Sequence, residues 1–292
     1  MSAAVATLEY THVDVFTPVP YAGNSLPVFR DARGLTAAQM LRITQELRHF
    51  EAIFLEPTAR PGAVRARVFD LREELPFAGH PVIGAAAVLH HAAGDHTARH
   101  WEVALPGKTV RVATERTSRG YTGVVDQGRP TLHGEIADRA RFARAFGLDA
   151  EDLDPALPLE IVSTGLRYLI VPVRSGALAR ARIAHDITAL LHGSGAEFAV
   201  LFDEVALEIR HWNNDGVLED VATGSAAGTI GAYRLRHRLA RGGERFVLHQ
   251  GRFTGRPSRL FVQADGLPEA LQAVSVGGDV AVVGRAMLEA TP

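Results

Sequence analysis

Two stretches of the chain resemble each other, and this internal similarity limits the folds that the chain can adopt. ELPFAGHPVIGAAAVL covers residues 74–89, and EDVATGSAAGTIGAYRL covers residues 219–235. Each has a glutamate five residues before a glycine, then a polar residue, then a run of small residues. The two glycines, Gly79 and Gly224, are 145 positions apart, close to half of the 292 residues. This spacing predicts two similar domains that each contribute one such corner.

A helix that begins at each corner would offer an anion-binding end. Its first backbone N–H groups have no partner within the helix, and the helix dipole adds partial positive charge there. Glycine lets a ligand approach the backbone, while His80 and Ser225 follow it with polar side chains. Neither corner has the GxxxxGK[ST] or GxGxxG spacing, which argues against nucleotide binding. The simpler alternative is that Ser225 or Thr223 only caps the helix and that Asp220 only makes a turn.

Composition narrows the class of protein further. Apolar residues make up 47% of the chain, enough for two cores, and 31 Lys and Arg face 33 Asp and Glu. This balance gives no basic field for nucleic acid or an anionic membrane, so a small-molecule partner fits better. We find no signal peptide or membrane-span pattern and expect a soluble, cytoplasmic protein. The absence of cysteine excludes disulfides, thiolate metal sites and thiol catalysis.

The local pattern predicts mixed α and β structure rather than a regular βαβ alternation. Thr36 to Leu47 is expected to be a helix with a Thr36-x-x-Gln39 capping box, and Ile136 to Phe146 a second helix that ends at Gly147. Strands are expected at residues 11–16, 52–57, 66–71, 159–163, 168–173, 198–202 and 205–212.

With YAGNSLPVF (21–29) and HQGRFTGRPS (249–258), the two corners resemble the phenazine-biosynthesis isomerase (PhzF-like) family, which has the diaminopimelate-epimerase-like fold. The resemblance runs in order over nearly the whole chain. It implies an α+β fold of two pseudo-symmetric domains, each a barrel-like β-sheet wrapped around a central helix, with the active site between them and usually a homodimer. The last strand of such proteins returns to the first domain. We therefore expect one domain of residues 1–118 plus 280–292 and another of residues 119–279.

The resemblance also implies roles for particular residues. It places the family's catalytic glutamate at Glu51 and the partner acid at Asp220. The substrate-binding positions fall on His80, Ser225, Gly79, Gly224 and, more weakly, Asn24. The implied reaction moves a proton, and with it a double bond, in a small unsaturated carboxylate or amino acid, in antibiotic or other specialised metabolism. Such chemistry needs one residue that takes and returns a proton and donors where negative charge develops, with no cofactor and no metal.

The sequence departs from the family pattern around these residues. Glu51 lies among Phe50, Ala52 and Ile53, where the family usually has hydroxyl side chains, and apolar surroundings favour the neutral carboxylic acid. The strands before the corners read Phe69-Asp70-Leu71 and Trp212-Asn213-Asn214 instead of Phe-[Ser/Thr]-Pro. The substrate therefore need not be dihydro-hydroxyanthranilate, the phenazine precursor.

Two alternative functions stay open. Epimerases that use two thiols are excluded because the chain has no cysteine, but Glu51 and Asp220 could form a two-carboxylate epimerase or tautomerase. A non-catalytic binding or scaffold protein that kept the cleft is the third hypothesis.

Two other features are interpreted as structural. The histidines at 90, 91, 96 and 100 have a spacing that matches no common zinc pattern. The arginines at 234, 236, 238 and 241 are expected to form a solvated helix face.

Overall fold

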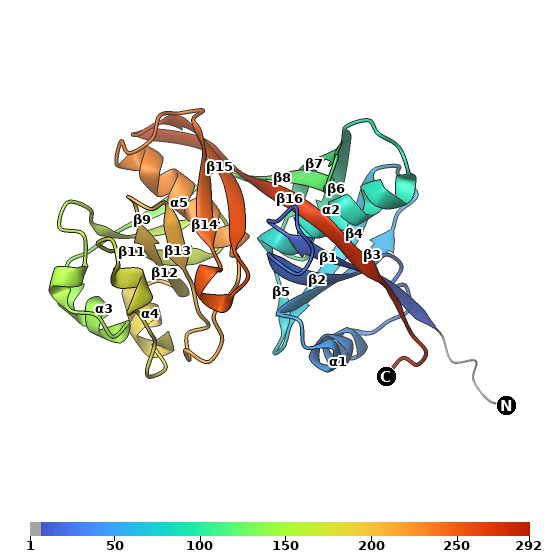
Figure 1. Cartoon of the computed structure of the whole chain (residues 1–292), viewed down its shortest axis with the longest axis horizontal. Helices are drawn as coiled ribbons and strands as arrows, with labels where there is room; N and C mark the ends of the chain where they lie inside the picture. Colours follow the sequence, from blue (N-terminus) through green and yellow to red (C-terminus); the bar gives the residue numbers. More distant parts are fainter. Residues whose placement is uncertain (1–6) are drawn as a thin grey trace. The chain divides into compact units, whose positions relative to one another are not determined.

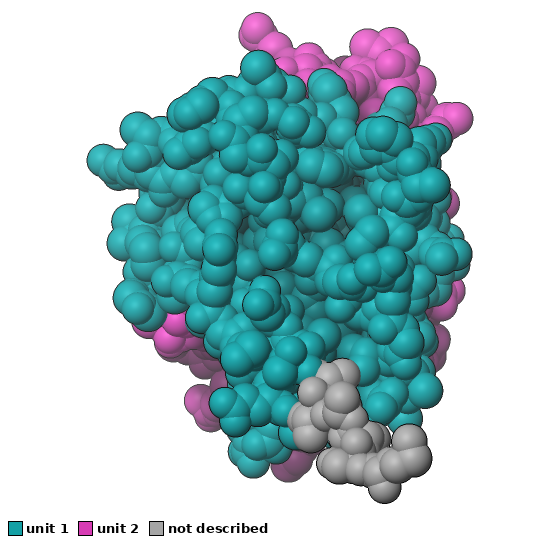
Figure 2. All heavy atoms as spheres, turned by 90° about the vertical axis from the view of Figure 1, so that its right-hand side faces the viewer, with its two compact units in different colours: residues 1–126, 277–292 teal, residues 127–276 magenta. Residues whose placement is uncertain are grey.

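The computed structural model describes residues 7–292, which divide into two compact units (Figure 1). Unit 1 comprises Met1–Asp126 with Gly277–Pro292, and unit 2 comprises Gln127–Val276; Figure 2 colours them teal and magenta. These boundaries differ by several residues from those expected at 118 and 280. The stretch around residue 119 is the turn of a hairpin, in which Thr117 pairs with Gly120.

Unit 1 contains a closed barrel of eight strands. Hydrogen bonds join them in the order β1-β2-β3-β4-β6-β7-β8-β16, and β16 pairs back onto β1, while β5 adds to β4. Closure leaves this sheet without free edges. The strands are β1 (Leu8–Val15), β2 (Asn24–Phe29), β3 (Glu51–Pro57), β4 (Ala63–Asp70), β5 (Glu74–Leu75), β6 (Arg99–Ala104), β7 (Thr109–Thr117), β8 (Gly120–Gly128) and β16 (Ala270–Leu288), the last two continuing into unit 2.

Parallel strand pairs require crossover connections, and in unit 1 these hold the two helices. The crossover between β2 and β3 contains α1 (Ala37–Leu47), and the one between β4 and β6 contains α2 (Gly79–Ala93). Helix α1 covers one face of the strands, and the capping box predicted at Thr36 is confirmed. Helix α2 is buried almost all round and packs against β1, β2, β3 and β7, enclosed by the strands in Figure 1.

Unit 2 repeats this plan. Its sheet runs β16-β15-β14-β13-β12-β11-β10-β9, with parallel pairs β11–β12 and β13–β14. Helix α5 (Gly224–Arg236) packs against β15 and also against β10 and β11, so the sheet curls around it. The strands are β9 (Thr131–Ile136), β10 (Leu159–Ser163), β11 (Arg167–Pro172), β12 (Phe198–Asp203), β13 (Glu208–Arg210), β14 (Arg245–Gln250) and β15 (Ser258–Leu267).

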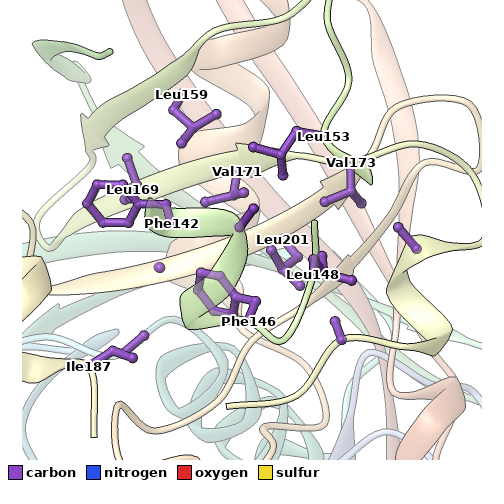
Figure 3. Packing of buried hydrophobic residues seen from close by; sticks show 14 of the residues in the cluster. Phe142, Phe146, Leu148, Leu153, Leu159, Leu169, Val171, Val173, Ile187 and Leu201 are labelled. Atoms are coloured by element: carbon purple, nitrogen blue, oxygen red, sulfur yellow. The ribbon is translucent and has the colours of Figure 1, made fainter. Parts of the chain in front are cut away.

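The outer face of the unit 2 sheet carries a second core. Helices α3 (Arg139–Ala145) and α4 (Thr188–Ser194) lie in connections of this unit. Phe142 and Phe146 belong to a buried cluster with strand residues such as Leu169 (Figure 3). Within residues 7–292, the remaining elements are three short 3-10 helices, η1 (Ala150–Asp152), η2 (Ala177–Ala179) and η3 (Arg252–Thr254).

Three sequence-based predictions about unit 2 need correction. Helix α3 starts at Arg139 rather than at Ile136, because residues 131–136 form β9 and Asp138 caps the helix. The strand expected at 205–212 is only β13, because Asp203 accepts from the backbone of Val205 and Ala206 and makes a turn there. Arg234 is not part of a solvated face: it is buried and bonds to Glu204.

Among the described helices, none combines the length and the apolar character that crossing a membrane requires.

Candidate active site

At one end of the unit 1 barrel, three of the residues assigned by sequence come together. Glu51 is the first residue of β3, His80 the second of α2 and Asn24 the first of β2. The Oε2 atom of Glu51 lies 3.4 Å from Nδ1 of His80, and the Nδ2 atom of Asn24 lies 3.5 Å from the same nitrogen. All three side chains are buried. The geometry therefore pairs a carboxyl group with an imidazole at the beginning of the central helix.

The alternation of side chains along a strand explains why the surroundings of Glu51 are less apolar than its neighbours in the sequence suggest. Successive side chains of a strand point to opposite faces. Ala52 and Phe54 pack in the cluster under α1, so Glu51 points the other way, toward α2 and His80. The neighbour that matters for the carboxyl group is thus an imidazole from a distant part of the chain.

The position of Asn24 depends on the backbone conformation of the glycine before it. Gly23 has a φ of +63°, and a Cβ added there would lie 2.4 Å from the carbonyl oxygen of Val15. Only glycine adopts this conformation without strain and avoids that contact. Gly23 thereby lets β2 begin at Asn24, beside the start of the central helix.

The corner of unit 2 brings Asp220 and Ser225 to the start of α5. The hydroxyl of Thr223 donates to Oδ2 of Asp220 at 2.5 Å, and the backbone N–H of Ala222 donates to Oδ1 at 3.3 Å. The hydroxyl of Ser225 is 2.8 Å from that of Tyr168 on β11. Gly79 and Gly224 are the first residues of α2 and α5, as the corner pattern predicts.

A short ribbon presents Asp220. Trp212 and Glu219 form an isolated bridge, and the N–H of Asp220 donates to the carbonyl of His211 at 3.0 Å. The guanidinium of Arg210 donates twice to the carboxylate of Glu219, at 2.8 and 2.6 Å, and lies over the ring of Trp212. This largely buried ion pair fixes the ribbon on which Asp220 lies.

Three residues that the sequence did not single out as site residues lie around this corner: Tyr168, His211 and Gln250. His211 is buried, and its Nδ1 lies 2.9 Å from the carbonyl oxygen of Ala199. Burial lowers the pKa of His211 below its ordinary value, and this outweighs the opposing influence of Asp220. The neutral imidazole lies edge-on to the ring of Tyr168, with ring centres 5.5 Å apart.

Two side chains at the positions where the sequence departs from the family pattern make structural hydrogen bonds. Oδ1 of Asp70 accepts from the N–H groups of Arg72 and Glu73. Asn214 donates from its side chain to the carbonyl of Glu197. Both side chains therefore stabilise loops that precede the corners.

Potential metal ligands do not gather in the described part of the chain, where no three His, Cys, Asp or Glu side chains have the geometry to hold an ion. Two histidines of the 90–100 cluster, His90 and His91 in the last turn of α2, contact strand residues. His90 lies 2.9 Å from the hydroxyl of Thr114 and His91 lies 3.1 Å from that of Tyr121.

Two units, each with a sheet curled around a helix that begins at a polar corner, define the diaminopimelate-epimerase-like fold. Solved structures agree. The chain aligns with a predicted epimerase from Pseudomonas aeruginosa at a TM-score of 0.91 and 47% identity, covering 96% of this chain and 99% of that one. It aligns with a hydroxyproline epimerase from Agrobacterium vitis at a TM-score of 0.65 and 12% identity, covering 98% and 92%. The second likeness concerns the fold alone.

Sequence comparison gives the family. The model of the family described as phenazine biosynthesis-like protein (PhzC-PhzF) matches residues 13–286. A trans-2,3-dihydro-3-hydroxyanthranilate isomerase from Pseudomonas fluorescens is 33% identical over 290 residues, which cover 95% of this chain and 98% of the relative. The chain therefore belongs to the phenazine biosynthesis-like (PhzF) family, and its curated relatives of this type are isomerases.

Proposed function

We propose that the protein is an isomerase that shifts a proton and a double bond in a small unsaturated carboxylate or amino acid, with Glu51 as the residue that takes and returns the proton. The observation that carries the proposal is the buried pairing of Glu51 with His80, at 3.4 Å between Oε2 and Nδ1. A carboxyl group beside an imidazole at a helix start is suited to proton transfer next to a developing negative charge.

The proposed reaction conserves all atoms. The Glu51 carboxylate removes a proton from one carbon of the substrate, and the electron pair of that C–H bond moves into the conjugated system as a dienolate. The resulting carboxylic acid returns the proton to a carbon farther along this system, so the double bond moves and the carboxylate is regenerated. His80 and the N–H groups at the helix starts would stabilise the negative charge. No cofactor or metal enters this scheme.

The second corner supplies substrate binding in this proposal. Asp220 would anchor an amine or a hydroxyl group, and Ser225 would donate to a substrate oxygen. Asn24 forms part of the pocket wall, and Gly79 and Gly224 leave room for the substrate at the two helix starts. The homodimer implied by the family resemblance is also a prediction, and sedimentation of the purified protein tests it.

Deuterium incorporation measured by NMR tests the proposal. The first substrate is trans-2,3-dihydro-3-hydroxyanthranilate, on which the Pseudomonas fluorescens relative acts according to its name, followed by other cyclic and acyclic unsaturated amino acids. In deuterated water the wild type should exchange the migrating proton, and Glu51→Gln should lose at least about 100-fold in rate, the usual contribution of a general acid-base residue. Glu56→Gln is the matched control, since Glu56 lies on the same strand and pairs with Arg65.

Two outcomes contradict the proposal. If Glu51→Gln exchanges as fast as the wild type, Glu51 is not the base. If substrates bind but the wild type neither converts them to a rearranged product nor exchanges their protons, the binding or scaffold hypothesis replaces the isomerase.

A two-carboxylate epimerase or tautomerase is the second candidate. It is favoured by the 47% identity to a structure described as a predicted epimerase. The position of the label separates the two: an epimerase introduces deuterium at the carbon that lost the proton, whereas the proposed isomerase introduces it at an allylic carbon.

A further inference from the structure

One buried amide contacts the Asp220 corner at three points. Gln250, the last residue of β14, is 1% exposed. Its Nε2 donates to the carbonyl oxygen of Asp220 at 2.9 Å and to the hydroxyl of Thr223 at 3.0 Å, while its Oε1 accepts from the N–H of Thr223 at 2.8 Å. The two donors and the acceptor of the amide are thus all directed at one turn. A fully buried amide that is satisfied in this way has one orientation, because a flipped amide would face donors with donors.

The amide also sets the direction of the Thr223 hydroxyl. A hydroxyl has a single proton to donate. Because Oγ1 of Thr223 accepts from Gln250, its proton goes to Oδ2 of Asp220, at 2.5 Å. Thr223 occupies the N-cap position of α5, yet its side chain makes no capping bond within the described chain. The hydroxyl is committed to the carboxylate instead.

The other unit shows that the fold does not require an amide at this place. Gly107 and Gly251 approach the two corners in the same way. A Cβ added to either would lie 2.7 Å from a carbonyl oxygen three residues before the corner glycine, that of Pro76 or of Val221. The residue before Gly251 is Gln250, whereas the residue before Gly107 is a proline, which has no side-chain donor. The amide belongs to the unit that carries Asp220.

We propose that Gln250 is a positioning residue of the active site, which holds the Asp220 carboxylate in one rotamer through the hydroxyl of Thr223. This inference rests on the proposed function, in which Asp220 anchors the substrate. Gln250 does not touch the reacting atoms. It fixes the direction of the Thr223 hydroxyl, and that hydroxyl fixes the carboxylate.

The chain offers a matched control for this inference. Gln127 is a second buried glutamine at the start of α5: its Nε2 donates to the carbonyl of Gly224 at 2.9 Å, and its Oε1 accepts from the hydroxyl of Thr164 at 2.7 Å. Gln127→Met and Gln250→Met therefore each delete a buried amide near the same helix end. They differ in whether the amide leads to the pair formed by Thr223 and Asp220.

The kinetic test compares these variants in the exchange reaction. Gln250→Met and Thr223→Val should each lower kcat by about 10- to 100-fold, the effect of misplacing a group in an active site. Thr223→Ser keeps the hydroxyl and should restore kcat to within about threefold of wild type. Gln127→Met should lose stability in urea unfolding but keep kcat within about threefold. Equal losses of kcat in Gln250→Met and Gln127→Met would overturn the inference, since the amide would then only stabilise the fold.

A second measurement does not depend on activity. The carbon-13 resonance of the Asp220 carboxyl group reports its rotamer and hydrogen bonds. It should move or broaden in Gln250→Met and Thr223→Val and stay unchanged in Gln127→Met. An unchanged resonance in Gln250→Met would overturn the inference. If the wild type neither converts nor exchanges the substrates while the resonance responds as expected, the proposed isomerase fails and the positioning of Asp220 by Gln250 stands.

Discussion

Arg67 and Arg210 form the same pair of contacts in the two units of the chain. Each donates twice to a glutamate, Glu74 or Glu219, that lies five residues before a corner glycine. Each also places its guanidinium over an aromatic ring two residues further along the chain, Phe69 at 5.4 Å or Trp212 at 4.3 Å. The internal similarity of the sequence thus extends to the ion pairs that hold the segments leading into α2 and α5.

The two ion pairs should contribute unequally to stability. In unit 2 the side chains of Arg210 and Glu219 are 9% and 13% exposed, against 31% and 27% for Arg67 and Glu74. Removing one partner of a buried pair leaves an uncompensated charge, so Arg210→Met should lower the free energy of unfolding by about 3 kcal/mol. Arg67→Met should cost about 1 kcal/mol because solvent screens its partner. Urea unfolding measures both; Arg111→Met, which removes an exposed pair with Asp126, is the control.

The sequence pattern predicted the two corners but not the residues that contact them. The glycine spacing predicted that helices start at Gly79 and Gly224, and both do. Tyr168 and Gln250, by contrast, contact the second corner from 57 and 27 residues away in the chain. Such contacts depend on which strands lie beside α5 and in which register. No local pattern in the sequence encodes that information.

Burial was the second property that local patterns did not give. The arginines that follow Arg234 in the sequence predict a solvated helix face, but Arg234 itself is buried. Its partner Glu204 comes from a turn 30 residues earlier. The guanidinium of Arg234 lies 4.2 Å from the ring centre of Phe246. For Glu51, strand alternation decided which neighbours matter. The roles assigned to Glu51 and Asp220 stay predictions until the exchange experiment is done.

Gly228 should tolerate no side chain. A Cβ added there would lie 1.9 Å from Oε1 of Gln127 and 3.2 Å from Oγ1 of Thr164. The amide of Gln127 is held by its own hydrogen bonds, so it cannot move away freely. Overpacking of this kind costs about 1 to 3 kcal/mol, and we expect Gly228→Ala to lie at the upper end in urea unfolding. A stability equal to wild type would show that the amide can shift.

Gly193→Ala is the matched control for that substitution. Gly193 lies within α4, and apart from its chain neighbours and its own helix backbone a Cβ there would meet no described heavy atom within 4 Å. Because alanine loses less backbone entropy than glycine in a helix, this variant should be more stable than wild type by about 0.5 to 1 kcal/mol.

Tyr168→Phe should have a larger effect on kcat/KM than on the free energy of unfolding. It removes only the hydroxyl that lies 2.8 Å from the hydroxyl of Ser225. Loss of one such bond costs about 1 kcal/mol of stability. If Ser225 binds a substrate oxygen as proposed, its hydroxyl loses the partner that orients it, and kcat/KM for the exchange reaction should fall by about tenfold. Tyr121→Phe, which removes the bond to His91, deletes the same atom elsewhere and should leave kcat/KM unchanged.

The buried His211 should make stability depend on pH in the weakly acidic range. Its pKa in the folded protein lies below the ordinary value of 6.5, because burial disfavours the imidazolium. The unfolded chain therefore takes up a proton that the folded chain does not, as pH falls below 6.5. The stability contributed by the neutral imidazole is fully present above that pH and is lost below it, by at most about 1.4 kcal/mol per pH unit.

Urea unfolding at a series of pH values measures this slope. His211→Gln can still donate to the carbonyl of Ala199 and should flatten the slope. Replacement of the exposed His133 by glutamine is the control and should leave the slope unchanged. A slope that is identical in wild type and His211→Gln would assign the acid sensitivity to other groups.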